Sequence, residues 1–354
     1  MFRRLVYIFL IMLPLSCIDP YRVDLLEGEQ LLTVDGFIHT DPGPHSIRLT
    51  RTDTYGSVFE GLIRPVRQAT VSVRDSQGLV TFLTEVEPGL YQTPSSFQAR
   101  PGLSYTLQIR LLDGKEYASF PEEVHPVPPI DQISYRSVRR ATENRLEDRF
   151  GVEFFAHFRD PSEQKNYYYW RMDPSVFVLV ANPERYTNPP THPTNPRGPA
   201  PKDCCDICYL VEQPRIQQFA IASDENFNGL NTVVPIAFVE DNGLRFKDTF
   251  RAEFLQMGIS QGAHRYLRLI DQQLGITGSV FDQPPANIRG NIISLDNPDE
   301  TVLGYFITGS VQRSTVYVKR SELEFTALPR IIPDDCRTVA NATIAPPANW
   351  NPGN

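Results

Sequence analysis

Three residues have the spacing of a serine-hydrolase nucleophile elbow, G-x-S-x-G: Gly258, Ser260 and Gly262. The motif lies between an expected strand and an expected helix, as that chemistry requires. The reaction also needs a histidine from elsewhere in the fold to accept the serine proton. His264 is the only histidine after Ser260, and it follows four residues later on the same expected helix. We therefore interpret Ser260 as a helix cap and keep a serine hydrolase as a remote alternative.

Four cysteines in the second half of the chain favour structural disulfides: Cys204, Cys205, Cys208 and Cys336. A bridge from the 204–208 cluster to Cys336 would close a loop of about 130 residues, which chain entropy values at about 4–5 kcal/mol. Cys204 and Cys205 are adjacent, so we expect them to take different partners. The C-x-x-C spacing of Cys205 and Cys208 also leaves a redox pair or half of a metal site open.

A weak calcium candidate begins at Asp224, because Asp224, Asn226 and Asn228 match the first half of a D-x-N-x-N-G calcium loop. The twelfth position of such a loop is a bidentate glutamate, but Pro235 occupies it here. We therefore favour a polar hairpin turn. The histidines lack zinc-hydrolase spacing, and no metal or other cofactor is expected.

Tyr167-Tyr168-Tyr169-Trp170 could form a platform on which a sugar stacks. Alternation along a strand places the first and third rings on one face and the other two on the opposite face. At least one face then packs in a core, which is the interpretation we favour. The acidic pairs Glu122-Glu123 and Asp334-Asp335 lie in proline-rich segments, where we expect solvated charge.

Short strands are the elements expected to position these residues, because 31 of the 354 residues are proline and long helices are disfavoured. Apolar alternation between turn signals predicts an antiparallel β-sandwich over residues 31–121. Further strand patterns predict a larger β domain over residues 130–335. The proline-rich stretch at 120–129 separates the two.

One segment, residues 260–274, has helical periodicity instead. Its apolar residues fall on one face: Ala263, Tyr266, Leu267, Ile270 and Leu274. Ser260 is the expected N-cap, and Gly275 is expected to end the helix. Residues 182–203 contain seven prolines and predict a long surface loop, and residues 336–354 predict an irregular tail.

The amino terminus has the features of a secretory signal, with Arg3 and Arg4 before an apolar run at 6–15. That run is shorter than the roughly 20 residues of a membrane-spanning helix. Pro14-Leu15-Ser16-Cys17 resembles a bacterial lipoprotein box. We expect residues 1–16 to be removed, Cys17 to carry diacylglycerol and acyl chains, and residues 17–30 to form a tether. A plain signal peptide with a coincidental cysteine is the alternative.

The net charge of −8 argues against a nucleic-acid partner, because phosphate neutralisation requires clustered Lys and Arg. Removal of residues 1–16 takes away two arginines and no acid, which gives a mature charge of −10. No later segment has 18 consecutive uncharged apolar residues.

Gly89-Leu90-Tyr91 followed by Thr93-Pro94 resembles prealbumin-like modules in architecture. The expected fold is therefore mainly β. An N-terminal antiparallel sandwich of prealbumin or immunoglobulin type precedes a larger β domain that carries one α-helix.

Longer motifs carry a second resemblance: Val34-Asp35-Gly36, Gly43-Pro44-His45, Asn166 to Trp170, G-S-V-F-D-Q-P-P at 278–285, R-G-N-I at 289–292 and V-L-G-Y-F at 302–306. Together they resemble a family of Bacteroidota outer-membrane lipoproteins classed as a domain of unknown function (4249). Genes of that family often lie beside TonB-dependent receptors. The resemblance implies a lipid-anchored partner of such a receptor in nutrient uptake, facing the cell surface or the periplasm. It supplies no catalytic residues, so we expect no enzyme. A structural or adhesive envelope lipoprotein is the alternative.

Overall fold

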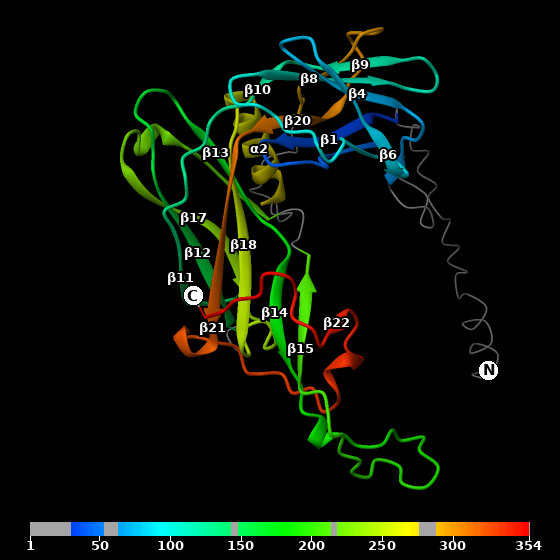
Figure 1. The fold of residues 1–354 in the computed structure, drawn as a ribbon, viewed down its shortest axis with the longest axis vertical. Helices are drawn as coiled ribbons and strands as arrows, with labels where there is room; N and C mark the ends of the chain where they lie inside the picture. The colour runs from blue at the N-terminus through cyan, green and yellow to red at the C-terminus, as the bar shows by residue number, and fades with distance from the viewer. Residues whose placement is uncertain (1–29, 53–62, 143–147, 214–217, 276–287, 354) are drawn as a thin grey trace, which may run out of the picture.

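The computed structural model describes residues 30–52, 63–142, 148–213, 218–275 and 288–353. The expected signal peptide, Cys17, nearly all of the tether and the 278–285 motif lie outside the described residues. The described chain is mainly β with one α-helix, which confirms the predicted fold class (Figure 1). Among the described residues no helix has the length and apolar character needed to cross a membrane.

Two six-stranded sheets form a sandwich near the N-terminus, drawn mostly in blue and cyan in Figure 1. Sheet A contains, in spatial order, β20 (Leu303–Gly309), β1 (Leu32–His39), β2 (Ser46–Thr52), β7 (Leu90–Gln92) and β6 (Thr84–Glu87), with β3 (Ile63–Pro65) on β2. Sheet B contains β19 (Ile292–Ser294), β9 (Glu116–Ser119), β8 (Ser104–Arg110), β4 (Thr70–Asp75) and β5 (Val80–Phe82), with β10 (Glu122–Glu123) on β8. Alternate apolar residues of both sheets fill the core between them, among them Val34, Ile47, Leu107 and Phe306.

Two strands of this sandwich come from late in the chain. β20 pairs in parallel with β1, and β19 pairs with β9. Both lie within residues 130–335, which the sequence assigned to the C-terminal domain, so sheet membership crosses the expected boundary. Apolar alternation predicts that both segments are strands. It does not predict which strands they pair with, because a parallel partner is joined through a long connection.

The V-L-G-Y-F and R-G-N motifs serve this pairing. Gly304 has φ +93°, and a Cβ there would overlap the main chain of Val34 on β1. The Asn291 amide pairs with the main chain of Phe306, accepting its N–H and donating to its carbonyl, both at 2.9 Å. The motifs therefore have a packing role in seating β20.

The second half of the chain forms two further sheets around an aromatic core that includes Phe154, Phe158, Trp170 and Phe254. Sheet C contains β11 (Gln132–Arg140), β12 (Arg149–Arg159) and β17 (Asn231–Glu240). Sheet D contains β16 (Phe219–Ser223), β13 (Tyr167–Met172), β18 (Thr249–Gly258), β14 (Ser175–Val180), β15 (Ile207–Glu212) and β22 (Ala342–Thr343), with β21 (Val311–Lys319) on β18.

The helix α2 (Gln261–Leu274) follows β18 directly and confirms the predicted helix. The Ser260 hydroxyl accepts the Ala263 N–H at 3.1 Å, as an N-cap does. Ala263 and Leu267 are buried, whereas Leu274, expected on the same face, is 43% exposed. α2 packs against β13, β16 and β20, so it covers the face of sheet A that points away from the sandwich core.

The C-terminal tail is more ordered than expected. It contains the short turn η4 (Cys336–Thr338) and strand β22, and Trp350 packs edge-on against Tyr209 and Tyr317. The rest of residues 336–353 consists of turns, bends and segments without regular structure. The proline-rich loop begins at η1 (Pro183–Arg185) and projects from the lower end of the molecule in Figure 1.

Candidate functional site

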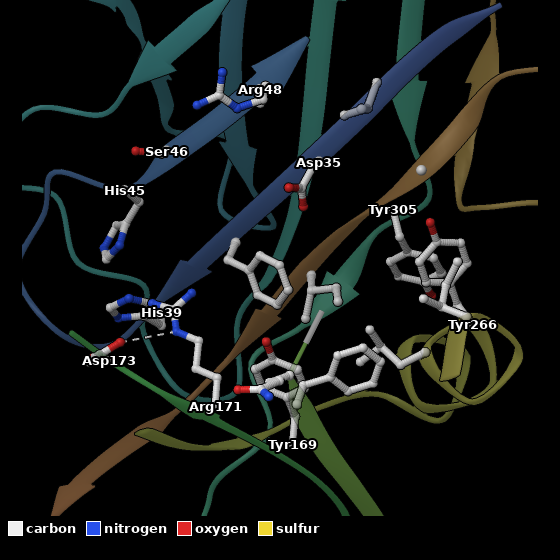
Figure 2. A pocket seen from close by; sticks show the side chains of 18 of the residues that line it. Asp35, His39, His45, Ser46, Arg48, Tyr169, Arg171, Asp173, Tyr266 and Tyr305 are labelled. Atoms are coloured by element: carbon white, nitrogen blue, oxygen red, sulfur yellow. Dashed lines mark ion pairs between the residues drawn. The ribbon is translucent and has the colours of Figure 1, made fainter. Parts of the chain in front are cut away.

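A cavity of about 850 Å³ lies between the outer face of sheet A, strand β13 and helix α2 (Figure 2). Its walls come from both halves of the chain. The side chains on which the argument below depends are Asp35, Phe37 and His39 of β1, Arg48 of β2, Tyr169 of β13, Tyr266 of α2 and Tyr305 of β20. The cavity therefore exists only when the N-terminal sandwich and the C-terminal sheets are folded together.

The alternation of β1 explains why its polar residues face this space. Val34 and Ile38 are fully buried in the sandwich core, and the residues that alternate with them point to the opposite face. Asp35, Phe37 and His39 therefore share one side of the strand. In an isolated sandwich that side would face solvent, but here α2 and β13 enclose it.

Aromatic rings form one wall of the cavity. The Tyr169 ring lies 5.6 Å from Phe37 and 5.8 Å from Phe219, and Tyr266 lies 4.9 Å from Tyr305, all between centroids. Burial raises the pKa of Tyr169 and of Tyr266 to about 12, so both phenols are neutral at pH 7. The wall offers flat apolar faces with hydroxyl groups at their edges, which suits a ligand that contains a ring.

Two opposite charges face the same cavity and lie across from each other. Asp35 and Arg48 are directly opposed across the β1–β2 pair, and both side chains are exposed to the cavity. Neither forms a hydrogen bond or ion pair with the described residues. Desolvation by the surrounding protein raises the pKa of Asp35, against the opposing effect of Arg48 and Arg171. An unpaired carboxylate in such a place is a candidate contact for a polar ligand.

Two buried histidines close the end of the cavity near the β1–β2 loop. The rings of His39 and His45 lie 4.2 Å apart, and burial lowers the pKa of His39 to about 3 and lowers that of His45. Both are therefore neutral at pH 7. The His45 Nε2–H donates to the Asp41 carbonyl at 3.1 Å, and the Asp41 N–H donates to His39 Nδ1 at 3.3 Å. The pair holds the loop in place.

An ion-pair group next to the histidines joins this loop to sheet D. The Arg313 guanidinium donates to Asp41 at 2.7 Å and to Glu253 at 3.5 Å, and it also pairs with Asp173. Arg171 lies 3.4 Å from the Asp173 carboxylate, an ion pair drawn as a dashed line in Figure 2. Asp41 is thus the point where the N-terminal hairpin is held against the C-terminal sheets.

The structure places Ser260 beside a carboxylate and not beside a histidine. Its hydroxyl donates to Glu122 at 2.6 Å, and the other Glu122 oxygen accepts from the Tyr305 hydroxyl at 2.7 Å. The His264 ring packs against Tyr167 instead. Within the described chain no imidazole reaches Ser260, which favours the capping interpretation.

The expectation of solvated acidic pairs is wrong for one member of each pair. Glu122 is 6% exposed and Asp335 is 4% exposed. Glu122 is buried because it joins β10 to the N-terminus of α2 and to β20. Asp335 is buried because its carboxylate binds the Arg337 side chain and caps η4.

The calcium candidate does not come together as a site. Asp224 is buried, and its carboxylate accepts the Asn166 N–H at 2.7 Å, while Asn226 and Asn228 are exposed. Among the described residues, no group of three His, Cys, Asp or Glu side chains that could hold a metal ion includes Asp224. The turn instead holds the beginning of β13.

The cysteines divide into one bridge and one free pair. Cys208 and Cys336 form a disulfide with their Cα atoms 5.8 Å apart, as predicted for the 204–208 cluster. Cys204 and Cys205 are free, and their sulfur atoms lie 2.7 Å from each other. The expectation that they take different partners is therefore wrong.

The tyrosine run is core, as predicted, but one of its rings also reaches the cavity. Tyr168 and Trp170 are fully buried between sheets C and D, and Tyr169 is on the opposite face. Alternation alone could have indicated Tyr169 as a candidate, as it could Asp35 and His39. What the sequence did not show is that these two faces meet, because β1 and β13 are far apart in the chain.

A comparison with protein-family models matches residues 18–315 to a domain of unknown function (DUF4249). The match begins directly after Cys17 and includes all the cavity residues named above. No curated protein matches the chain.

Proposed function

The chain belongs to the DUF4249 family, and from this membership and the cavity we propose that it is a lipid-anchored accessory protein of the outer membrane. In this proposal it captures a small ligand and assists a TonB-dependent receptor in nutrient uptake. The cavity is the observation that carries the binding part. The lipoprotein box at Cys17 supports the anchor, and the resemblance described above supports the receptor partner.

The chemistry of the cavity supports a ligand with a ring and polar groups. Phe37 and Tyr266 are half-buried and offer ring faces. Asp35 and Arg48 offer a carboxylate and a guanidinium that form no hydrogen bond or ion pair with the described residues. Both groups therefore keep donor or acceptor capacity that a polar ligand can use. A volume of about 850 Å³ suits a molecule the size of an oligosaccharide unit or a short peptide.

We propose binding and not catalysis. Ser46 lines the cavity next to His45, yet the two are not coupled. The Ser46 hydroxyl accepts from Gln92 at 3.2 Å, and the His45 ring is hydrogen-bonded to the Asp41 carbonyl. Nucleophilic catalysis would require the base to accept the proton of the hydroxyl directly.

Nutrient-limited growth tests the proposal. A deletion strain is complemented with the wild-type chain, with Asp35→Asn plus Arg48→Ala, or with Arg74→Ala. Arg74 is exposed on β4 in the other sheet and serves as the matched control. Strains are compared on single sources drawn from oligosaccharides, peptides and nucleosides at limiting concentration. Loss of two charge-assisted contacts is expected to reduce capture about tenfold or more.

The outcomes separate the parts of the proposal. A growth defect of the deletion strain on one source, reproduced by the double variant and not by Arg74→Ala, supports it. A deletion strain that grows normally on every source but attaches differently to surfaces favours the structural or adhesive alternative. A deletion defect that the double variant fully rescues contradicts the role of the cavity.

A further inference from the structure

The two free cysteines lie together at the base of the proline-rich loop, far from the cavity. Cys204 is exposed and Cys205 half-buried, and their sulfur atoms are 2.7 Å apart. That separation is well inside the ordinary contact distance of two sulfurs. The two thiols therefore face each other and are open to solvent.

The neighbouring disulfide uses the other two cysteines that the structure describes. Cys208 of β15 and Cys336 of η4 are both fully buried and bonded to each other. The Cys336 N–H also donates to the Cys205 carbonyl at 2.9 Å, which holds the free pair against the tail. The C-x-x-C spacing seen in the sequence therefore does not mark the reactive pair, because Cys208 is already used.

A cation lies beside the pair. The Arg337 Nη2 is 3.6 Å from the Cys204 sulfur, and the same guanidinium binds the Asp335 carboxylate through Nε and Nη2. The thiolate is the nucleophile in disulfide exchange, and the Arg337 guanidinium lies where it can contact a charged Cys204 sulfur. The hydrogen bond from Cys205 to Cys204 raises the pKa of Cys205. The arrangement places the Cys204 sulfur next to a cation, with the Cys205 thiol donating a hydrogen bond to it.

We propose that Cys204 and Cys205 are a reversible redox pair that closes to a disulfide between adjacent residues. The Cys204 thiolate attacks a disulfide of an envelope protein or of a small molecule, forms a mixed disulfide and releases one thiolate. The Cys205 sulfur then loses its proton, attacks the Cys204 sulfur and releases the second thiolate. The pair gives up two electrons and two protons, and the donor disulfide becomes two thiols.

A Cys204–Cys205 bond would differ from the Cys208–Cys336 disulfide in the length of chain that it closes into a loop. The Cys208–Cys336 bond closes a sequence separation of 128 residues and is buried. A bond between neighbours closes no chain segment, so it adds almost no loop-closure stabilisation. Exposed disulfides are also the ones that reductants reach first. The pair is therefore expected to open and close while the structural bridge stays intact.

The same residues could instead hold a soft metal ion, because one Asp335 oxygen and both sulfurs lie within 4.8 Å of one another. Two features argue against this. Both oxygens of Asp335 already bind Arg337, and the positive charge of that side chain repels a cation. A metal is therefore treated as an outcome of the test.

Differential alkylation of the full mature chain tests the proposal. The protein is purified without reductant, equilibrated with oxidised glutathione and alkylated. It is then reduced and alkylated with a second reagent. Peptide mass spectrometry reads each cysteine, and the intact mass is measured beside that of the reduced protein. Cys204→Ser is the matched control, because it leaves Cys205 without its neighbour.

Closure of the pair predicts that Cys204 and Cys205 escape the first reagent and that the Cys204→Ser variant exposes Cys205 to it. The chain should be lighter than its pair-reduced form by two hydrogen atoms. Graded dithiothreitol should open the pair at a concentration about tenfold or more below that which opens Cys208–Cys336.

Three results would overturn the proposal. Both thiols could react fully with the first reagent after treatment with oxidised glutathione. Protection could disappear with a chelator and leave the mass unchanged, which would assign a metal site. Finally, the pair could open only together with the Cys208–Cys336 bond.

Discussion

At the scale of single residues, Asp35 links stability to binding. It faces the cavity opposite Arg48, it forms no hydrogen bond or ion pair with the described residues, and desolvation raises its pKa. A raised folded-state pKa means that the ionised form is disfavoured in the fold. The free energy of unfolding therefore falls as pH rises through the unfolded-state pKa, and this loss is complete once the pH exceeds the folded-state pKa.

Asp35→Asn is therefore expected to raise the free energy of unfolding at pH 7 while weakening ligand capture. Urea denaturation at pH 7 and at pH 3 measures the first effect, which should vanish at pH 3, where the unfolded carboxyl is also protonated. Glu123→Gln, an exposed carboxylate on β10, is the control and should change neither property. Lower stability of Asp35→Asn at pH 7 would contradict the account.

His39 carries the clearest pH dependence. Its pKa is lowered from 6.5 to about 3 by burial, so the folded state binds fewer protons than the unfolded state between these values. Its stabilising contribution is complete above pH 6.5 and is lost as pH falls toward 3. The loss from one histidine has a limiting slope of about 1.4 kcal/mol per pH unit.

The free energy of unfolding of His39→Asn is therefore expected to change less with pH than that of the wild type. Thermal unfolding of both proteins from pH 7 to pH 4 gives the slopes, with His192→Asn in the exposed loop as control. If the slope of His39→Asn matches that of the wild type, His39 binds protons equally in the folded and unfolded states and its burial does not have the stated effect.

At the scale of elements, the disulfide between β15 and η4 orders the tail. It encloses 128 residues of separation, so chain entropy in the unfolded state predicts a contribution of about 4–5 kcal/mol. The double variant Cys208→Ala plus Cys336→Ala should lose most of this amount in urea denaturation. Cys204→Ser plus Cys205→Ser closes no comparable loop and should stay within about 1 kcal/mol of the wild type. An equal loss in both variants would argue against the loop-closure explanation.

Elements with local signals were predictable from the sequence. The start of α2 was predicted from Ser260, and its buried face was predicted from Ala263 and Leu267. The structure has Ser260 as the N-cap and buries both apolar residues. The alternation around Tyr168 predicted a strand that packs in the core, and this strand is β13. The neighbours of β19 and β20 were not predictable, because non-local pairing leaves no periodic signal within either strand.

The candidate site was not predicted from the sequence for the same reason. Asp35, Arg48 and Tyr169 each lie on a face that alternation could assign, but the sequence did not indicate that the faces of β1 and β13 enclose one cavity. The burial of Glu122 was missed because its partners, Ser260 and Tyr305, come from far along the chain.

At the scale of the whole molecule, the proposed lipid anchor would hold the cavity at the membrane. Cys17→Ser is expected to abolish incorporation of a labelled fatty acid and to move the chain from the membrane fraction to the soluble fraction, because two or more acyl chains are needed for stable attachment. Ser16→Ala, which keeps the cysteine, serves as control. Continued labelling of Cys17→Ser would contradict the lipoprotein assignment.

The central claim is that the anchored chain works with a TonB-dependent receptor. It is tested most directly by affinity purification of the tagged wild-type chain from detergent-solubilised outer membrane, with Cys17→Ser processed in parallel. The account predicts that a TonB-dependent receptor is recovered in near-stoichiometric amount with the wild type and is depleted with Cys17→Ser. Purification of the wild-type chain without any such receptor would contradict it.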